Sequence, residues 1–433
     1  MHVPPRAHHE RIRATRAFDV REVGRFLLDF IMLELEQALQ RILSSVQPLD
    51  LEKVSLQEAA GRVLAEPTVS PVDLPLFDNS AMDGYAVRAV DLANASGNDP
   101  RALRMIGKVA AGNVFNGTVR AGTCVRLFTG SPLPCGADAV VMQEDTRVDP
   151  VPSEQVWFFD AVKPWENIRL QGEDIKRGAK LAETGSRLTA ARAGLLAATG
   201  ITEITVARQP RVALLSTGSE LTEGARPLLP GKIYESNRVM LAALMKRVGA
   251  VARIFPPAPD TLEGTRAALE TMLNESDAVV ASGGVSVGEY DFVKAAFEKL
   301  GGELVFWKIS IKPGKPFVFG RAGKKFLFGL PGNPVSAFVT FLLLVRPALA
   351  AMQGAAETGL PQSIGVLAEP LTNPGERRHF LRVLVDDAGR VSSAGTQASH
   401  RLGSLAEANG LLDVPPQTSL PAGASVSVLR WDG

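Results

Sequence analysis

The sequence predicts a multidomain protein of α/β plus β class, and three observations lead to this prediction. Apolar strand-like runs alternate with amphipathic helix patterns from Arg211 to Met352. Residues 71–159 contain short apolar runs punctuated by glycines, and the tail, 353–433, contains only short strand-like runs. The chain has 433 residues, and domains of about 150 residues are common, so about three domains are expected.

The fold is predicted to begin near Met32. A clean amphipathic helix pattern follows this residue. Residues 1–31 are expected to be an N-terminal extension outside the fold, and a non-native origin is one alternative for them. The apolar positions of this first helix are Leu35, Ala38, Leu39, Ile42, Leu43 and Val46.

A mixed domain is predicted from residues 32–70 and 160–205, with the β-rich insertion domain, 71–159, between its two halves. Ser55–Glu58 carries a short helix signal, and a second helix is expected over Thr189–Thr199, where Gly200 would end it. In the insertion, Cys124–Phe128 and Ala139–Met142 have strand character.

Residues 206–352 are predicted to form a parallel sheet covered by helices on both faces, because β–α units of this length repeat. The expected strands are Val212–Leu215, Val251–Phe255, Ala278–Ala281 and Phe326–Leu330, and the expected helices are Asn237–Val248, Leu262–Leu273, Phe292–Leu300 and Val335–Met352. The tail, 353–433, with runs such as Phe380–Val385 and Val426–Leu429, is predicted to be a small β barrel or sandwich.

Composition excludes several classes of function. Lys plus Arg is 47 and Asp plus Glu is 46, so no net basic field favours nucleic acid or an anionic membrane. The longest apolar run, Val335–Val345, is too short to span a bilayer. Two cysteines and five histidines argue against a Cys/His zinc site and against a histidine-activated nucleophile. The groups that remain for the chemistry of the site are carboxylates, lysines, hydroxyls and an oxygen-ligated cation such as Mg²⁺. The low number of cysteines fits a cytoplasmic location.

Three polar loops follow predicted strands of the parallel sheet: Ser216–Glu220, Ser282–Glu289 and Gly329–Pro334. Ligands bind outside the carboxyl ends of such strands. Glycines allow close approach, and a helix N-terminus offers N–H groups to an anion. Lys312 and Lys315 add two cations on one turn, which is either a solvated turn or an oxyanion site.

The segment Asp78–Val87 reads Asp-Asn-Ser-Ala-Met-Asp-Gly-Tyr-Ala-Val. Its polar residues fit either a solvated turn or a functional loop. Two other carboxylates also have a structural alternative, since Asp260 and Asp291 precede predicted helices and could act only as N-caps. Glu220 has no such role, which favours contact with a metal or substrate.

Together these loops resemble the molybdopterin molybdenumtransferase family, to which the E domain of gephyrin belongs. The resemblance covers about residue 33 to the C-terminus. The matching motifs are Asp78–Val87, Phe128–Gly130, Gly172–Asp174, Ser216–Leu221, Gly283–Glu289, Lys312–Pro316 and Leu330–Ser336.

The resemblance implies an elongated homodimer of four-domain subunits, with an active cleft between the α/β domain of one subunit and the β-rich insertion of the other. It also implies that molybdate and adenylated molybdopterin are substrates, that Mg²⁺ is required and that AMP is released. A molybdopterin adenylyltransferase would hand over the substrate.

The residues at the family's functional positions follow from the same resemblance. Those implied to be catalytic are Asp83, Asp174, Glu220, Asp260 and Asp291, of which Glu220, Asp260 and Asp291 would hold the metal. Those implied to bind substrate are Thr129, Gly130, Thr217, Gly218, Ser282, Gly283, Gly284, Ser286, Gly288, Lys312, Lys315, Pro331, Gly332, Asn333, Pro334, Ser336, Arg382 and Ser399.

The sequence departs from the family pattern at two positions. Ser219 stands where many members have Asp, and Ala398 stands where Gly is usual, so that a Cβ could restrict the backbone there. The alternatives are a molybdopterin adenylyltransferase or a competence-damage pyrophosphatase, which would lack the Asp78–Val87 motif, and a non-catalytic gephyrin-like scaffold, which would bind partner peptides.

Overall fold

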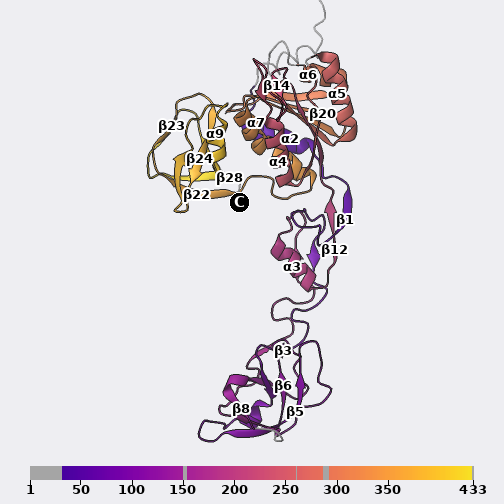
Figure 1. The fold of residues 1–433 in the computed structure, drawn as a ribbon, viewed down its shortest axis with the longest axis vertical. Coiled ribbons are helices and arrows are strands. Elements are labelled where there is room, and N and C mark those ends of the chain that lie inside the picture. Colours follow the sequence, from indigo (N-terminus) through magenta and orange to yellow (C-terminus); the bar gives the residue numbers. More distant parts are fainter. Residues whose placement is uncertain (1–31, 150–153, 260, 286–291, 432–433) are drawn as a thin grey trace, which may run out of the picture. The chain divides into compact units, whose positions relative to one another are not determined.

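The computed structural model describes residues 32–149, 154–259, 261–285 and 292–431. The chain divides into two compact units, Leu51–Ala207 and a second unit that joins the described residues up to Asp50 with those from Arg208 onward (Figure 1). The predicted extension, 1–31, lies outside the described residues.

The larger unit contains a six-stranded sheet in the order β16-β13-β17-β21-β20-β18. The predicted parallel part is confirmed by β13 (Arg211–Ser216), β16 (Val251–Ile254), β17 (Ala278–Ser282) and β21 (Lys325–Leu330). The helices that alternate with these strands are α4 (Asn237–Val248), α5 (Leu262–Glu275) and α6 (Val293–Lys299).

Two strands of this sheet are antiparallel additions that the sequence prediction missed: β18 (Glu303–Lys308) and β20 (Pro316–Ala322). β20 and β21 form a hairpin through Gly323, with Ala322 opposite Lys325. Apolar runs on both sides of a short Gly-containing turn are a hairpin signal, so the sheet is mixed at this edge.

The core of the larger unit surrounds a helical stretch that begins at Pro334. It consists of α7 (Pro334–Thr340), a π-helical segment η3 (Phe341–Val345) and α8 (Arg346–Met352). Pro347 lacks an N–H group and crowds the carbonyl one turn earlier, which accounts for the local departure from α-helix. The whole stretch is long and apolar enough to cross a membrane, but 89% of its apolar window is buried inside the fold.

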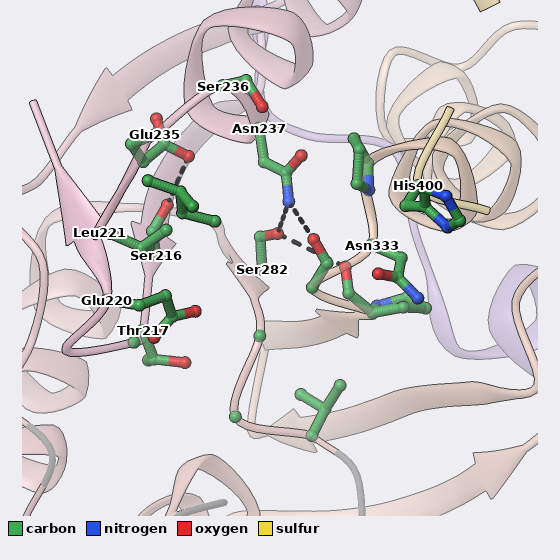
Figure 2. A pocket seen from close by; sticks show the side chains of 18 of the residues that line it. Ser216, Thr217, Glu220, Leu221, Glu235, Ser236, Asn237, Ser282, Asn333 and His400 are labelled. Carbon is green, nitrogen blue, oxygen red and sulfur yellow. Dashed lines mark hydrogen bonds between the residues drawn. The ribbon is translucent and has the colours of Figure 1, made fainter. Parts of the chain in front are cut away.

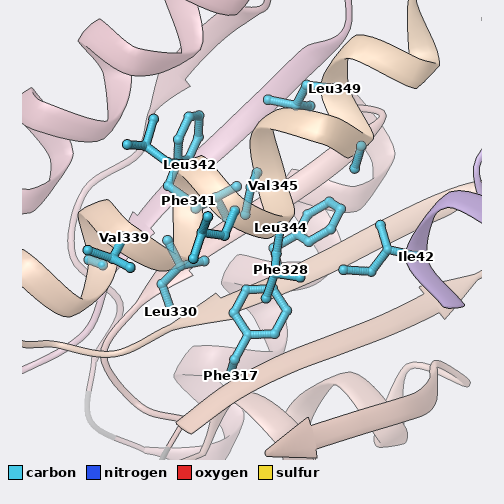
Figure 3. Packing of buried hydrophobic residues seen from close by; sticks show 14 of the residues in the cluster. Ile42, Phe317, Phe328, Leu330, Val339, Phe341, Leu342, Leu344, Val345 and Leu349 are labelled. Carbon is cyan, nitrogen blue, oxygen red and sulfur yellow. The ribbon is translucent and has the colours of Figure 1, made fainter. Parts of the chain in front are cut away.

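The first helix, α2 (Leu35–Ser45), belongs to this same core. It buries Leu35, Ala38 and Ile42, and Ile42 points toward the cluster around Phe341 and Leu344 (Figure 3). The segment 32–70 is therefore shared between the two units, because residues from Leu51 onward belong to the smaller one.

The C-terminal region of the larger unit forms a closed five-stranded β barrel, as predicted. The strands are β22 (Gln362–Leu367), β24 (Arg378–Val385), β25 (Arg390–Ser393), β26 (Gly410–Val414) and β28 (Ser425–Arg430). The barrel closes because β24 pairs with both β25 and β26. The other elements here are β19 (Ile311–Lys312), which pairs with β24, β23 (Leu371–Asn373), β27 (Thr418–Leu420) and α9 (Leu402–Glu407).

The smaller unit contains two subregions. One includes the pair β1 (Leu51–Ser55) and β12 (Glu203–Ala207), the pair β2 (Thr68–Val69) and β11 (Lys180–Ala182), and helix α3 (Ala190–Ala198). The short helix predicted at Ser55–Glu58 is wrong. Ser55 pairs with Glu203 at the end of β1, and a turn follows in which Glu58 N–H donates to the carbonyl of Ser55 at 3.1 Å. Strand pairing with a distant segment outweighs the weak local propensity.

The other subregion is the β-rich insertion, a six-stranded sheet in the order β7-β4-β6-β5-β9-β8. Its strands are β4 (Gly84–Val87), β5 (Arg101–Val109), β6 (Thr123–Leu127), β7 (Ala139–Met142), β8 (Thr146–Val148) and β9 (Gln155–Phe158), and a short pair, β3 (Asn79–Ser80) with β10 (Ile168–Arg169), lies beside it in the chain.

Candidate functional site

The loops predicted to share one edge of the sheet do meet there. Ser216 at the end of β13 is in register with Ser282 at the end of β17, and Ser282 is in register with Leu330 of β21. Beyond these strand ends lies a hollow of about 1040 Å³, called here the first hollow. Its lining includes Ser216, Thr217, Gly218, Ser219, Glu220, Leu221, Ile233, Tyr234, Glu235, Ser236, Asn237, Ser282, Gly283, Gly284, Val285, Pro316, Pro331, Gly332, Asn333, Pro334, His400 and Leu402.

Two glycines allow the first two loops to touch. Gly283 and Gly284 have φ of 88° and 66°. A Cβ at Gly283 would lie 2.8 Å from the carbonyl oxygen of Thr217, and one at Gly284 would lie 2.7 Å from the Thr217 hydroxyl. Both the backbone conformation and the lack of space therefore require glycine.

A short segment at the start of α4 ties the three strand ends together (Figure 2). Glu235 Oε1 accepts a hydrogen bond from Ser216 Oγ at 3.1 Å. The Asn237 Nδ2 amide donates to Ser282 Oγ and to the Gly332 carbonyl oxygen, each at 2.8 Å. Arg238 forms a buried ion pair with Glu235, with 3.2 Å between Nε and Oε2. Hydrogen bonds and an ion pair thus connect the loops at this edge of the sheet.

Glu220 lies on the wall of the first hollow and is exposed. β14 (Leu221–Thr222) begins at the next residue and pairs with β15 (Ile233–Tyr234). The neighbouring Ser219, which replaces the family's Asp, is exposed, and its carbonyl accepts a hydrogen bond from Lys232.

A second hollow of about 550 Å³ adjoins the first. It shares Pro316, Pro331 and Asn333 with the first hollow. Its other lining residues are Lys312, Pro313, Gly314, Lys315, Ser336, Arg377, Gln397, Ala398 and Ser399. The structure therefore brings the predicted Lys312, Lys315, Ser336 and Ser399 to one place, although they come from three separate segments.

The loop of the β barrel that carries Ser399 is fixed against the start of α7. Asn333 Nδ2 donates to Ser399 Oγ at 3.1 Å, and Val335 N–H donates to the carbonyl of Ser399 at 3.2 Å. Asn333 is the N-cap residue of α7, and Pro334 occupies its first turn. Pro334 has no N–H group and the Val335 N–H is bonded to Ser399, so this helix start serves to fix the barrel loop beside the second hollow.

Arg382 stabilises the loop that carries Ser399 through hydrogen bonds. Its side chain is fully buried, and the guanidinium donates to the carbonyls of Thr396 and Ala398 and to Ser404 Oγ, at 2.6, 3.3 and 3.1 Å. It does not line the second hollow. Ala398 has no positive φ, so its Cβ is compatible with the loop.

The second hollow has a cationic surrounding. Lys312, Lys315 and Arg377 all line it, and Arg377 Nη1 donates to the carbonyl of Ile311 at 3.0 Å. Burial, with the charges of Lys312, Arg382 and Arg377, lowers the pKa of the nearby His379 to about 4. This imidazole is therefore neutral at physiological pH, and the positive charge of the region comes from the lysines and arginines.

In the smaller unit the structure brings Asp83 and Thr129 together. Asp83 Oδ1 accepts hydrogen bonds from both the backbone N–H and the hydroxyl of Thr129, each at 2.8 Å. These two bonds, with a smaller contribution from the charge of Arg126, hold the pKa of Asp83 below its ordinary value. Arg126 lies over the rings of Tyr85 and Phe128, 5.0 and 5.3 Å from their centroids.

The other polar residues of the Asp78–Val87 motif build the loop itself. Asp78 Oδ1 accepts from the N–H of Gln171 at 2.7 Å, Asn79 Nδ2 donates to the carbonyl of Phe77 at 3.0 Å, and Ser80 Oγ donates to that of Met82 at 2.5 Å. Gly130, whose N–H donates to the carbonyl of Ser80 at 2.8 Å, completes the turn after Thr129.

Of the other predicted site residues, only Asp174 is described by the structure. Asp174 is exposed in the smaller unit, on a turn where its N–H donates to the carbonyl of Leu74 at 3.1 Å. Asp260, Ser286, Gly288 and Asp291 lie outside the described residues. In the part of the chain that is described, no group of three His, Cys, Asp or Glu side chains is placed to hold a metal ion.

Sequence reasoning missed several residues that line the hollows: Glu235, Asn237, Arg377 and His400. For Asn237 a signal was present. It begins the predicted helix 237–248, and a helix that follows a parallel strand starts at the same sheet edge where that strand ends. Arg377 and His400 belong to the barrel, whose position beside α7 no local pattern indicates.

Comparison with known proteins identifies the family. The N-terminal region of MoeA (domains I and II) matches residues 33–200, a probable molybdopterin binding domain matches 213–351, and the C-terminal region of MoeA (domain IV) matches 365–431. The chain belongs to the MoeA family. The matches on both sides of residues 213–351 distinguish it from the single-domain alternatives considered above.

Relatives of known function support this assignment over nearly the whole length. The molybdopterin molybdenumtransferase of Haemophilus influenzae is 39% identical over 404 residues, covering 92% of this chain and 98% of the relative. Molybdopterin molybdenumtransferase 2 of Mycobacterium tuberculosis is 41% identical over 388 residues, covering 88% and 94%. The molybdopterin biosynthesis MoeA protein of Pyrococcus horikoshii has a similar structure, with a TM-score of 0.79, 32% identity and coverage of 93% and 100%. This MoeA family member is thus an enzyme of the molybdopterin molybdenumtransferase type that acts in molybdenum cofactor biosynthesis.

Proposed function

We propose that this enzyme transfers molybdenum from molybdate to adenylated molybdopterin and releases AMP. The observation that carries the proposal is the common wall of the two hollows, formed by Pro316, Pro331 and Asn333. One hollow has the size of a nucleotide-like ligand and is lined by hydroxyls, glycines and carboxylates. The other is smaller and cationic, so an oxyanion bound there would lie beside the ligand in the first.

The second hollow would bind molybdate. Lys312 and Lys315 supply charge, and Ser336 and Ser399 supply hydroxyl donors. A dianion with oxygen acceptors suits this combination. Arg382 would act indirectly, by keeping the loop that carries Ser399 in place.

The first hollow would bind adenylated molybdopterin and carry out the hydrolysis. Water attacks the phosphorus atom, the phosphoanhydride bond breaks, and AMP leaves. Carboxylates can orient such a water molecule and accept its proton. Asp83, Asp174, Glu220, Asp260 and Asp291 are proposed for these tasks, and Thr129 keeps Asp83 ionised through two hydrogen bonds.

Mg²⁺ is proposed as the metal of this reaction. The donors fit a hard cation in type, because Glu220 and the surrounding hydroxyls of the first hollow offer oxygen only. Glu220, with Asp260 and Asp291, would hold the ion. When bound, Mg²⁺ would neutralise the charge that develops on the phosphate oxygens.

The proposal also includes a homodimer, a cytoplasmic location, and delivery of the substrate by a molybdopterin adenylyltransferase. The homodimer and the delivery are implied by the family resemblance, and the low number of cysteines fits the cytoplasmic location.

The decisive experiment incubates the protein with adenylated molybdopterin, Mg²⁺ and molybdate and follows AMP release and active cofactor. We expect Asp260→Asn and Asp291→Asn to block AMP release while the substrate still binds. Asp387→Asn, at an exposed position on a barrel turn, is the matched control and should react as the wild type does. Wild-type protein that binds the substrate without releasing AMP would contradict the proposal and favour a scaffold role.

A further inference from the structure

Asn237 occupies a central position in the wall of the first hollow. It is the first residue of α4, its side chain is 8% exposed, and it lies between the loop after β17 and the loop after β21 (Figure 2). Each of the two amide hydrogens on Nδ2 has its own acceptor, Ser282 Oγ and the Gly332 carbonyl oxygen, both at 2.8 Å.

The orientation of this amide is determined by its partners. The Gly332 carbonyl can only accept, so the NH₂ group must face it. Ser282 Oγ accepts a hydrogen bond from Asn237 and donates one to the carbonyl of Pro331 at 3.5 Å. The result is a chain of donors and acceptors from α4 to Ser282 and on to the residues that precede α7.

The amide oxygen of Asn237 has no comparable role. Among the described residues it has no hydrogen-bond partner, although it is buried. An unpaired buried acceptor has a free-energy cost. An asparagine placed here only to stabilise the core would be expected to satisfy both ends of its amide, so the position favours a use for its two donors.

We propose that Asn237 is a positioning residue of the reaction, and that its amide holds the Ser282–Gly284 loop and the Gly332–Pro334 loop at the spacing that the adenylated pterin requires. This inference rests on the proposed function of the first hollow. Both loops consist largely of glycine and proline, and the Asn237 side chain bonds to each of them. Loops that already have the required spacing lose less conformational entropy when the ligand binds, so binding is tighter.

The chain offers a matched control in Asn409. Its Nδ2 donates to the carbonyl of Val385 at 2.9 Å and its Oδ1 accepts from the N–H of Val385 at 2.8 Å, so it also ties two segments through two bonds. It lies in the barrel and lines neither hollow. Asn409→Ala should lower stability without weakening substrate binding.

The test measures binding of adenylated molybdopterin by calorimetry, together with the thermal midpoint of each variant. We expect Asn237→Ala to weaken binding about tenfold, the loss that corresponds to one or two hydrogen bonds, with a fall in Tm no larger than that of Asn409→Ala. Ser282→Ala, which removes one of the two acceptors, should have a smaller effect in the same direction and serves if Asn237→Ala folds poorly.

Asn237→Asp adds a readout that a merely structural role would not produce. The carboxylate keeps the shape of the side chain but turns acceptor oxygens toward the Gly332 carbonyl, so at pH 8 binding should be weaker than in Asn237→Ala. When the pH is lowered to 5.5, a protonated carboxyl can donate again, and the difference from wild type should shrink. Equal binding by folded wild type, Asn237→Ala and Asn237→Asp would overturn the inference, as would an equal loss in Asn409→Ala.

Hydrogen exchange separates this inference from the proposed function. In Asn237→Ala without ligand, amides of the two loops, including that of Gly283, which is bonded to the Leu330 carbonyl at 3.0 Å, should exchange about tenfold faster than in Asn409→Ala. If the exchange rates of these amides were unchanged, Asn237 would not hold the two loops in place. If the wild type binds no adenylated molybdopterin but these amides exchange faster in Asn237→Ala, the proposed function fails, while the role of Asn237 in holding the two loops is supported.

Discussion

At the scale of single residues, the environment of Asp83 shows how a loop can keep a carboxylate charged without burying it. Thr129 donates two hydrogen bonds to the same oxygen, Oδ1, and leaves Oδ2 with no hydrogen bond to the described part of the chain. Hydrogen bonds to the ionised form favour it, and so does the positive charge of Arg126. One oxygen is thus fixed in place, and the other is available to a substrate or water.

Replacing Thr129 with alanine tests this arrangement. The lost hydroxyl bond should raise the pKa of Asp83 part of the way toward the ordinary value of about 3.9, as measured by NMR titration of the carboxyl carbon. Because the folded pKa is lowered, ionised Asp83 contributes stability above its unfolded pKa, and this contribution is lost as the pH falls through the folded value. Thr129→Ser retains both donors and should leave the pKa unchanged. An equal rise in both variants would exclude a role for the hydroxyl.

Gly84 shows why the motif needs a glycine directly after Asp83. A Cβ at this position would overlap the carbonyl oxygen of Val141 on the paired strand β7. Gly84→Ala should therefore lower the free energy of unfolding by about 1–3 kcal/mol, measured by urea denaturation. Gly194→Ala is the control, since a Cβ there meets nothing within 4 Å and the residue lies inside α3. It should raise stability by about 0.5–1 kcal/mol. Similar losses in both would contradict the steric argument.

At the scale of secondary-structure elements, the start of α5 shows which residue caps the helix. The sequence left open whether Asp260 is only the cap of this helix. The N-cap residue is Thr261, whose Oγ1 accepts a hydrogen bond from the N–H of Gly264 at 3.1 Å. Thr261 therefore accounts for the capping of α5.

This assignment predicts the effect of two threonine substitutions in one helix. Thr261→Ala should lower the free energy of unfolding by about 1 kcal/mol, because an N–H of the first turn loses its acceptor. Thr271→Ala lies in the middle of α5, where the hydroxyl bonds only to the Ala267 carbonyl within the helix, and alanine should be neutral or slightly stabilising there. If the two variants had equal stability, Thr261 would not be the cap.

The elements that sequence could predict are those whose signal lies within a short stretch of chain. The register of Ser216 with Ser282 follows from parallel strands of similar length, and the polar loops at their ends line one hollow, as expected. The strand at Leu51–Ser55 depends on β12, about 150 residues further along the chain, and β18 is paired only through β20. Such partners are set by tertiary packing, which local propensity does not contain.

Some residues of the candidate site could also be predicted from a short stretch of sequence, whereas others are brought there only by tertiary packing. Lys312 and Lys315 were recognised because two cations on one turn are visible in sequence. Arg377 and Ser399 come to the second hollow through the pairing of β19 with β24 and through the bonds from Asn333 and Val335 to Ser399. These contacts join the barrel to the α/β sheet. They could be expected only from the family resemblance.

At the scale of the whole molecule, the proposed catalytic groups are divided between two compact units. Asp83, Thr129 and Asp174 belong to the smaller unit, and Glu220 with Lys315 belongs to the larger one. Each unit has its own hydrophobic core, so each can hold its loops without the other. A reaction that needs both sets must bring the units together, within one chain or between two chains.

We propose that two chains supply each active site, and mixing of inactive variants tests it. Asp83→Asn and Lys315→Ala should each be inactive as pure homodimers. Random reassociation yields about half heterodimers, and each heterodimer would contain one intact site of two, so roughly a quarter of wild-type activity should return. Mass spectrometry of differently tagged subunits would verify exchange. Mixtures of Asp83→Asn with Asp174→Asn, both altered at proposed catalytic residues of the smaller unit, should stay as inactive as their components. If the first mixture remained inactive despite subunit exchange and native folding, both loops would have to act within one chain.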